Sequence, residues 1–386
     1  MSGIPAARIT ITPKPARKPM DLADLLQHTV DSKASDLHLT MGQPPMIRIA
    51  GRLVPSGYET ELGPDETKNL IYSILTDDQK AKFEEEHELD FSIGITGVSR
   101  FRVNVFVQRG SVAGVFRTIG ENIPSFEQLT LPPIVRELAL LPRGLVLVTG
   151  PTGCGKSTTL AAIINLINQE REGHIITIED PIEFVHGHNR CTVNQRELGS
   201  DTHSFPRALK SVLREDPNVI LVGEMRDLET IAAALTLAET GHLVLSTLHT
   251  QDAAQTVDRI IDVFPPYQQE QIRVMVASSL RGVISQILLP RLDGEGRVAA
   301  REVMVVTPAI SAIIREGKTH QIYSAIQTGT RDGMCTMEKS LADLHNGGCI
   351  SEEDALSKAN HPQELRALIQ TPKSYHLQDM ASQEAQ

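Results

Sequence analysis

The sequence predicts an α/β protein built on a parallel sheet with helices on both faces, preceded by a smaller α+β domain. The parallel sheet is predicted by short apolar runs that alternate with helical patterns, as is typical of buried parallel strands. These runs lie at residues 145–148, 175–178, 219–222 and 243–248. The smaller domain is predicted by apolar and polar alternation at residues 101–107, the pattern of a half-buried strand. The length of 386 residues allows two or three domains.

Composition is typical of a soluble globular protein, with 40% hydrophobic and 22% charged residues. No apolar run reaches the length of about 18 residues that suggests a membrane-spanning helix. The four cysteines form no C-x-x-C pair, so neither zinc nor a disulfide framework is expected, and a reducing cytoplasm fits. The net charge of −11 and the absence of tryptophan argue against a nucleic-acid partner, which needs basic surfaces or stacking platforms.

The N-terminal part is predicted to be a small α+β domain, residues 20–119, after a proline-rich and basic leader, residues 1–19, that is expected to be disordered. A helix is expected to begin after Asp21, because leucines recur on one helical face behind it. Pro64 suits the first turn of a second helix. The other expected elements are a strand at 37–39, a hairpin at 47–53 turning near Ala50 and Gly51, a charged helix at 79–88, and paired strands at 100–108 and 112–118.

The remaining boundaries follow from the same patterns. We expect a linker and lead-in helix at residues 120–142, the core at 143–306, a helical region at 307–370 and a loose tail at 371–386. Within the core, the runs at 284–290 and 299–306 flank a turn-forming segment and predict a late hairpin. Thr307 and Pro308 form a favourable helix start, because an N-cap residue is followed by proline at the first helical position.

The stretch GPTGCGKST, here called the P-loop, satisfies the phosphate-binding pattern G-x-x-x-x-G-K-[ST] between an apolar run and a helix-compatible run. Its glycines let backbone N–H groups converge on phosphate oxygens. Lys156 is expected to reach the β- and γ-phosphates, and Ser157 to ligate Mg²⁺. The residues expected to contact the nucleotide are Gly150, Pro151, Thr152, Gly153, Cys154, Gly155, Lys156, Ser157 and Thr158. The sequence therefore predicts binding of a nucleoside triphosphate, and a chance match in a glycine-rich turn is the weaker alternative.

Acidic residues follow two other core strands. The segment TIEDPIEF places Glu179, Asp180 and Glu183 at the carboxyl end of a strand, where ligands bind in open α/β sheets. A carboxylate there suits the activation of water near a γ-phosphate, and an acidic surface turn explains the pattern equally well. The segment VILVGEMRD resembles a Walker B strand in which Glu224 holds Mg²⁺, although Asp is the usual acid there.

A histidine and three arginines complete the candidate residues. His249 ends a third apolar strand and is expected to sense the γ-phosphate or to link neighbouring sites, although a lone histidine is more often structural. His242 at the start of that strand is assigned no role. Arg102, Arg109 and Arg117 lie on or beside a strand pair of the small domain. Such arginines are usually solvated, and these could complete the charge of phosphoryl transfer only if their domain packs against a nucleotide site.

Four segments follow one another in an order that resembles the type II/IV secretion ATPase superfamily, and in particular its pilus-retraction branch. They are the P-loop, the acidic segment TIEDPIEF, the Walker B strand and the strand that ends in His249. The matching segments outside the P-loop include ASDLHL, RFRVNVFVQR, TVNQRELG, LREDPNVILVGEMRD, AETGHLVLSTLHT and REGKTHQI. The resemblance covers residues 20–370, and as a set these segments are highly specific.

The resemblance implies a RecA-like P-loop ATPase core with an N-terminal PAS-like α+β domain and C-terminal helices, assembled as a homo-hexameric ring. It implies ATP and Mg²⁺ as cofactors, Glu183 as the base that activates water, Glu224 as the Walker B acid and His249 as a His-box residue. It makes three arginines candidate arginine fingers: Arg102, Arg109 and Arg117.

The implied function is ATP-driven pilus retraction, with pilin depolymerisation and twitching motility. The ring is implied to work at the cytoplasmic face of the inner membrane, with peripheral membrane association only. Its implied partners are the pilus platform protein and a paralogous retraction ATPase, with no nucleic acid.

Two features depart from the family pattern. In the segment AISAIIRE, residues 309–316, Ser311 and Ala312 stand where the family carries Arg-Asn, so coupling to the pilus machine is expected to differ. The isoleucines of this segment, Ile310, Ile313 and Ile314, are expected to lie in the core. Cys154 replaces a common serine of the P-loop and is hypothesised to make activity sensitive to oxidation.

Three alternatives remain open. A pilus-assembly or type II secretion ATPase usually carries an extra N-terminal domain and often a four-cysteine zinc insertion, and the sequence matches neither feature. An accessory ring subunit without hydrolysis is disfavoured by four intact residues: Lys156, Ser157, Glu183 and Glu224. A nucleic-acid translocase is disfavoured by the acidic charge and by an aromatic content of only 4%.

Overall fold

The computed structural model describes residues 21–49, 51–120, 123–294 and 296–370. The predicted leader at 1–19, the turn residue Ala50 and the predicted tail at 371–386 lie outside the described residues. The chain divides into two compact units, Met1–Ile119 (unit 1) and Gly120–Gln386 (unit 2), and each is described by itself. Within the described residues, no helix combines the length and the apolar character needed to cross a bilayer.

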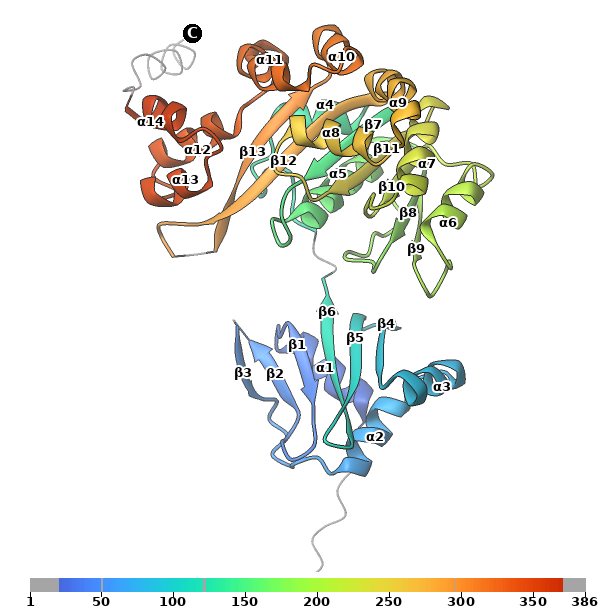
Figure 1. Ribbon diagram of the computed structural model, residues 1–386. Coiled ribbons are helices and arrows are strands. Elements are labelled where there is room, and N and C mark those ends of the chain that lie inside the picture. The colour runs from blue at the N-terminus through green and yellow to red at the C-terminus, as the bar shows by residue number, and fades with distance from the viewer. Residues whose placement is uncertain (1–20, 50, 121–122, 295, 371–386) are drawn as a thin grey trace, which may run out of the picture. The chain divides into compact units, whose positions relative to one another are not determined.

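Unit 1 is an antiparallel sheet with helices packed on one face (Figure 1). The strand order is β3-β2-β1-β6-β5-β4, and all neighbouring strands are antiparallel. The strands are β1 (Asp36–Leu39), β2 (Met46–Ile49), β3 (Arg52–Pro55), β4 (Glu88–Ile95), β5 (Ser99–Gln108) and β6 (Ser111–Ile119). The helices are α1 (Leu22–Asp31), α2 (Pro64–Tyr72) and α3 (Asp77–Glu86). The strands and helices predicted for this part of the chain are confirmed.

Capping and periodicity explain these elements. The Asp21 side chain accepts a hydrogen bond from the backbone of Ala23, so it caps the first turn of α1. On β5, Phe101, Val103 and Val105 are fully buried, as alternation predicts. The alternation stops at Val107, which is 38% exposed, so the prediction of a buried side chain there is wrong. Val107 is the last residue but one of β5, beside the turn that carries Arg109.

Unit 2 contains a seven-stranded sheet in the order β13-β12-β7-β11-β10-β8-β9. Its strands are β7 (Gly144–Thr149), β8 (Gly173–Glu179), β9 (Cys191–Glu197), β10 (Val219–Val222), β11 (Leu243–Leu248), β12 (Leu280–Pro290) and β13 (Arg297–Val305). All are parallel except β13, which pairs antiparallel with β12 as the predicted late hairpin. The sequence analysis does not include the edge strand β9, and the four predicted parallel strands are confirmed.

Helices cover both faces of this sheet (Figure 1). Successive residues of each central strand point to opposite faces, so Leu145 and Leu147 join one core while Val146 and Val148 join the other. The second core is formed with α4 (Pro133–Ala139) and α5 (Lys156–Glu170). The first core is formed with α6 (Phe205–Val212), α7 (Leu228–Glu239), α8 (Ala253–Asp262), α9 (Pro266–Ser279), α10 (Pro308–Arg315) and α11 (Ile322–Thr328).

The C-terminal region is helical, as predicted. Thr307 accepts a hydrogen bond from the backbone of Ile310, and Pro308 is the first residue of α10. A separate small core packs the ends of β12 and β13 against α12 (Met337–Asn346), α13 (Glu352–Lys358) and α14 (Pro362–Gln370).

Candidate active site

The P-loop connects β7 to α5, as the motif requires. Three of its glycines have positive φ angles: Gly150 at 137°, Gly153 at 77° and Gly155 at 88°. A Cβ atom on Gly150 would lie 2.2 Å from the carbonyl oxygen of Gln286, so no other residue fits there. Gly155 is the N-cap of α5, and the unpaired N–H groups of the first helical turn form an anion-binding end.

Strand β12 contacts the P-loop through Gln286, and the sequence analysis missed this contact. The buried side chain of Gln286 donates a hydrogen bond to the carbonyl of Cys154 at 2.8 Å. It also accepts one from the hydroxyl of Thr159 on α5 at 2.9 Å. One amide therefore joins the loop to the helix that follows it. No motif marks Gln286, because its role depends on the place of β12 beside β7 in the sheet.

The Lys156 side chain folds back toward the start of the P-loop. Its Nζ donates to the carbonyl oxygens of Gly150 at 2.8 Å and Pro151 at 3.1 Å. Burial lowers the pKa of Lys156 below its ordinary value, and the negative charge of Glu224 partly opposes this shift. The ammonium group and the Glu224 carboxylate therefore interact, although 68 positions separate them in the chain (224 minus 156).

The strand order brings Glu224 and His249 to the edge that carries the P-loop. Strand β11 lies between β7 and β10, and all three are parallel, so their carboxyl ends meet at one edge. His249 Nε2 lies 3.1 Å from Glu224 Oε1. Strand β8 passes close to Gly223, since a Cβ there would lie 3.3 Å from the backbone of Glu179, a tight contact. His242, at the opposite end of β11, contacts the Leu237 carbonyl at 3.1 Å, a contact with the end of α7.

Glu224 is also bound by Arg226, which the sequence analysis did not single out. Arg226 Nη2 lies 2.8 Å from Glu224 Oε2. Burial alone would raise the pKa of Glu224, but the hydrogen bonds and positive charges of Arg226 and His249 lower it below its ordinary value. The carboxylate is therefore ionised at neutral pH. The hydrogen bond and charge of Glu224, and to a smaller extent the charge of Asp180, raise the pKa of Arg226.

The acidic segment after β8 contains one buried and one exposed glutamate. Glu179 is 8% exposed, and burial raises its pKa above the ordinary value. Glu183 is exposed, and its carboxylate has no hydrogen-bond or ion-pair partner among the described residues. A base that activates water must be accessible, and Glu183 meets this requirement better than Glu179.

Cys154 is 3% exposed, and burial raises the pKa of its thiol. Reactive cysteines are accessible and have lowered pKa values, so the structure gives no support to an oxidation-sensitive thiol at this position. The side chain instead fills space beneath Gly150, whose added Cβ would lie 2.7 Å from the Cys154 sulfur.

The residues present fit a magnesium ion that is bound together with a nucleotide. Among the described residues, no group of three or more His, Cys, Asp or Glu side chains could hold a metal ion by itself. Ser157 and Glu224 offer the oxygen donors that Mg²⁺ prefers. Magnesium in such sites commonly takes its other ligands from phosphate and water, so few protein ligands are needed.

The three candidate arginines belong to unit 1. Arg102 on β5 lies directly opposite Arg117 on β6, so both side chains are on the face that the helices leave uncovered. Arg117 forms an ion pair with Asp36 at 2.9 Å. Arg109 is exposed in the turn between these strands, where its φ angle is 49°.

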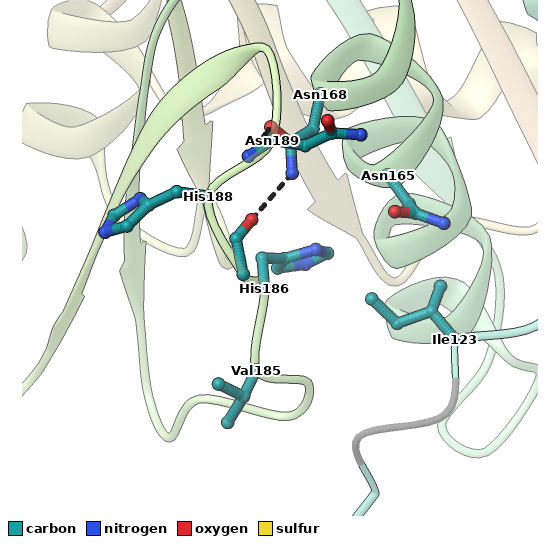
Figure 2. Close-up of a pocket in the computed structure, with 8 residues that line it drawn as sticks. Ile123, Asn165, Asn168, Val185, His186, His188 and Asn189 are labelled. Carbon is teal, nitrogen blue, oxygen red and sulfur yellow. Dashed lines mark hydrogen bonds between the residues drawn. The ribbon is translucent and has the colours of Figure 1, made fainter.

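A cavity of about 510 Å³ opens at the other end of α5, and Figure 2 shows its lining. Asn165 lies nine residues after Lys156, which is roughly 14 Å along the helix. The cavity is therefore separate from the P-loop. His186 is 9% exposed at this cavity, and burial lowers its pKa to about 4, so it is neutral. Asn168 is not free to bind a ligand, because its amide donates to the Gly187 carbonyl at 2.7 Å.

The C-terminal segment that departs from the family pattern forms α10. Ile310 and Ile314 are buried as expected, whereas Ile313 is only half-buried. The Ser311 hydroxyl donates to the carbonyl of Ala277 near the end of α9 at 2.8 Å. Ser311 therefore joins two helices of unit 2.

Comparisons with known proteins agree with this architecture. The family model described as "Type II/IV secretion system protein" matches residues 125–382. The chain is 52% identical to the "Type IV pilus retractation ATPase PilT" of Pseudomonas aeruginosa, over 89% of this chain and 99% of that protein. It is 43% identical to the "Type IV pilus ATPase PilU" of the same organism, over 91% of each chain.

A solved structure titled "Crystal Structure of the Pilus Retraction Motor PilT and Bound ADP" matches with a TM-score of 0.84 and 48% identity, covering 90% of this chain and 99% of the other. The structure of the ATPase DotB from Legionella pneumophila matches with a TM-score of 0.76 and 30% identity, covering 88% and 96% of the two chains. The family match and these relatives, covered almost from end to end, show that the chain belongs to the type II/IV secretion system protein family.

Proposed function

We propose that this chain is an ATP-hydrolysing motor subunit that drives the retraction of type IV pili. The observation that carries the proposal is the edge of the unit 2 sheet, where the P-loop, Glu224 and His249 lie on adjacent strands. The 52% identical relative is named a pilus retraction ATPase, and a similar solved structure holds ADP. Together they support ATP as the substrate and retraction as the work performed.

The chemistry follows from the positions of the side chains. The N–H groups of the P-loop and the Lys156 ammonium bind the β- and γ-phosphates and stabilise the charge that develops during transfer. Ser157 and Glu224 would hold Mg²⁺, which would neutralise phosphate charge when bound. Glu183 orients the attacking water and accepts its proton, because its carboxylate is exposed and has no partner among the described residues.

Two further sets of residues are proposed to act during nucleotide binding and hydrolysis. His249 contacts Glu224, so it is placed to respond when the environment of that carboxylate changes. The exposed arginines of unit 1 supply positive charge to the transferred phosphoryl group: Arg102, Arg109 and Arg117.

The working form is a homo-hexameric ring at the cytoplasmic face of the inner membrane, with peripheral membrane association. Its partners are the inner-membrane pilus platform protein and a paralogous retraction ATPase. The PilU relative, 43% identical, illustrates such a second ATPase in one organism. Coupling of hydrolysis to the platform depolymerises pilin and shortens the pilus.

The alternative function is that of a pilus-assembly or type II secretion ATPase, or of an accessory retraction subunit. Sequence identity favours retraction over secretion. The chain is 52% identical to the pilus retraction ATPase of Pseudomonas aeruginosa but only 33% identical to the type II secretion system protein E of Xanthomonas campestris. Against an accessory subunit without hydrolysis stand the exposed carboxylate of Glu183 and the ionised carboxylate of Glu224.

The test combines ATP hydrolysis by the purified protein with imaging of surface pili. We expect the wild type to hydrolyse ATP and Lys156→Ala to lose turnover, because the substitution removes the contact to the β- and γ-phosphates. We expect cells that lack the gene to accumulate pili that do not retract. Bald cells would instead support the assembly function, and a wild type without hydrolysis would overturn the ATPase assignment.

A further inference from the structure

The loop that carries Glu183 is held by side chains of the neighbouring edge strand. Strand β9 is parallel to β8, with Glu179 directly opposite Glu197, and its last four residues are polar. Gln195 and Glu197 are two positions apart, so both side chains project from the same face of the strand. The loop after β8 passes over this face.

Gln195 binds the loop on the C-terminal side of Glu183. Its Nε2 donates to the carbonyl of Phe184 at 2.8 Å, and its Oε1 accepts from the backbone N–H of His186 at 2.8 Å. The same Nε2 lies 3.2 Å from the Glu179 carboxylate at the end of β8. One amide side chain therefore joins the end of β8 to the loop at two further residues.

Glu197 binds the loop on the N-terminal side of Glu183. Its Oε2 accepts from the backbone N–H of Ile182 at 3.0 Å, and the side chain is 3% exposed. The backbone N–H of Leu198 donates to the Glu179 carbonyl at 2.8 Å, which fixes β9 against the end of β8. Hydrogen bonds to a buried carboxylate are among the stronger kind in proteins.

Glu183 is thus held through its neighbours. Its own N–H has only a 3.4 Å contact with Glu179, and its carboxylate has no partner among the described residues. We propose that Gln195 and Glu197 are positioning residues, which set the place of the Glu183 carboxylate by fixing the residues on either side of it. The inference rests on the proposed function, since it assigns a task to the loop of the base.

Gln195→Glu tests the inference, and Asn194→Asp is the matched control. Both substitutions replace an amide by a carboxylate on β9, but Asn194 contacts His174 at the start of β8, away from the loop. Gln195→Glu loses the donor to Phe184 and adds a negative charge beside Glu179. Because displacement of a catalytic group by about 1 Å can cost about 100-fold in rate, we expect kcat to fall between about 10- and 100-fold. The Kd for ATP should stay within about twofold in both variants, because neither residue contacts the P-loop.

A double-mutant cycle separates positioning from a general loss of structure. In a Glu183→Gln background, which lacks the base, Gln195→Glu should cause no further loss of hydrolysis. Gln195→Leu, which removes the same hydrogen bonds without adding charge, provides a second variant if Gln195→Glu does not fold. Retained ATP affinity in either variant shows that the core is intact.

Each outcome is decisive for one of the two proposals. A wild type that hydrolyses ATP, with a slow Glu183→Gln variant but a normal kcat in both Gln195 variants, would overturn the positioning inference and leave the proposed function intact. Additive losses in the cycle would overturn it as well, because they place Gln195 outside the action of Glu183. Absence of hydrolysis in the wild type contradicts the proposed function itself.

Discussion

Replacement of Gln286 by leucine tests how far the P-loop depends on β12. The amide of Gln286 donates to the Cys154 carbonyl and accepts from the Thr159 hydroxyl, and its exposed fraction is 1%. Leucine occupies nearly the same volume, so the substitution removes two hydrogen bonds while leaving little empty space.

The expected loss follows from the groups that are left behind. Thr159 is 2% exposed, and the contact to the Cys154 carbonyl is buried, so neither group can turn to water. A buried polar group that loses its partner costs about 1–3 kcal/mol, so the pair costs roughly 2–6 kcal/mol. For a domain of this size, even ~2 kcal/mol lowers the melting temperature by about 4–8 °C. Part of the loss should appear in nucleotide affinity, because the freed loop must be ordered again when phosphate binds.

The assay is thermal melting with and without nucleotide, together with the Kd for ADP. Gln269→Leu is the control, since that half-buried glutamine also donates to a backbone carbonyl, that of Phe264, in the first turn of α9. We expect Gln286→Leu to melt lower and to bind ADP at least about tenfold more weakly, corresponding to about 1.4 kcal/mol. An unchanged melting temperature and an unchanged Kd would refute the reasoning that this amide supports the loop.

Three further predictions concern the base, the arginines and pH. Glu183→Gln should bind ATP normally while hydrolysis slows by roughly 100-fold or more, and rapid turnover would contradict its role as base. Arg102→Ala should slow hydrolysis at least about tenfold, and it should not lower the stability of unit 1 because Arg102 lies opposite another cation, Arg117. The control is Arg52→Ala, which removes an exposed arginine from β3. Equal hydrolysis by both variants would show that Arg102 is an ordinary solvated arginine. Burial raises the pKa of Glu302 from 4.5 to about 7, so between these values the folded protein holds a proton that the unfolded chain releases. The free energy of unfolding of the wild type should therefore fall as pH rises through this window, by roughly 3 kcal/mol at most. Melting experiments should show a weaker dependence of stability on pH for Glu302→Gln. An identical pH dependence in both proteins would contradict the raised pKa of Glu302.

In unit 2, the parallel strands that sequence patterns predicted are those buried on both faces. β7, β8, β10 and β11 are largely apolar because helices cover them on either side. β9 was missed because it is an edge strand, in which polar residues alternate with Cys191 and Val193. Its polar residues serve the loop above it, so the feature that hid the strand is the one that gives it a role in the proposed mechanism.

Candidate residues were predictable where a motif joins them to a strand end. The strand order then explains why Glu224 and His249 meet, since each follows one of two adjacent parallel strands, β10 and β11. Gln286 and Arg226 were not predictable, because a lone amide or guanidinium has no periodicity or spacing that marks it. Their roles are set by neighbours that only the folded sheet supplies.

The support of the P-loop by β12 also has a consequence for the order in which the protein folds. The two contacts of Gln286 span 132 and 127 positions of sequence, and the contact between Thr149 and Ser285 spans 136. Contacts of such separation form late, because a long loop must close before they contribute. During synthesis the phosphate-binding segment leaves the ribosome well before the strand that supports it. A nascent chain that ends before β12 should therefore carry the complete motif and still bind nucleotide poorly, so that nucleotide capture reports completion of the sheet rather than synthesis of the motif.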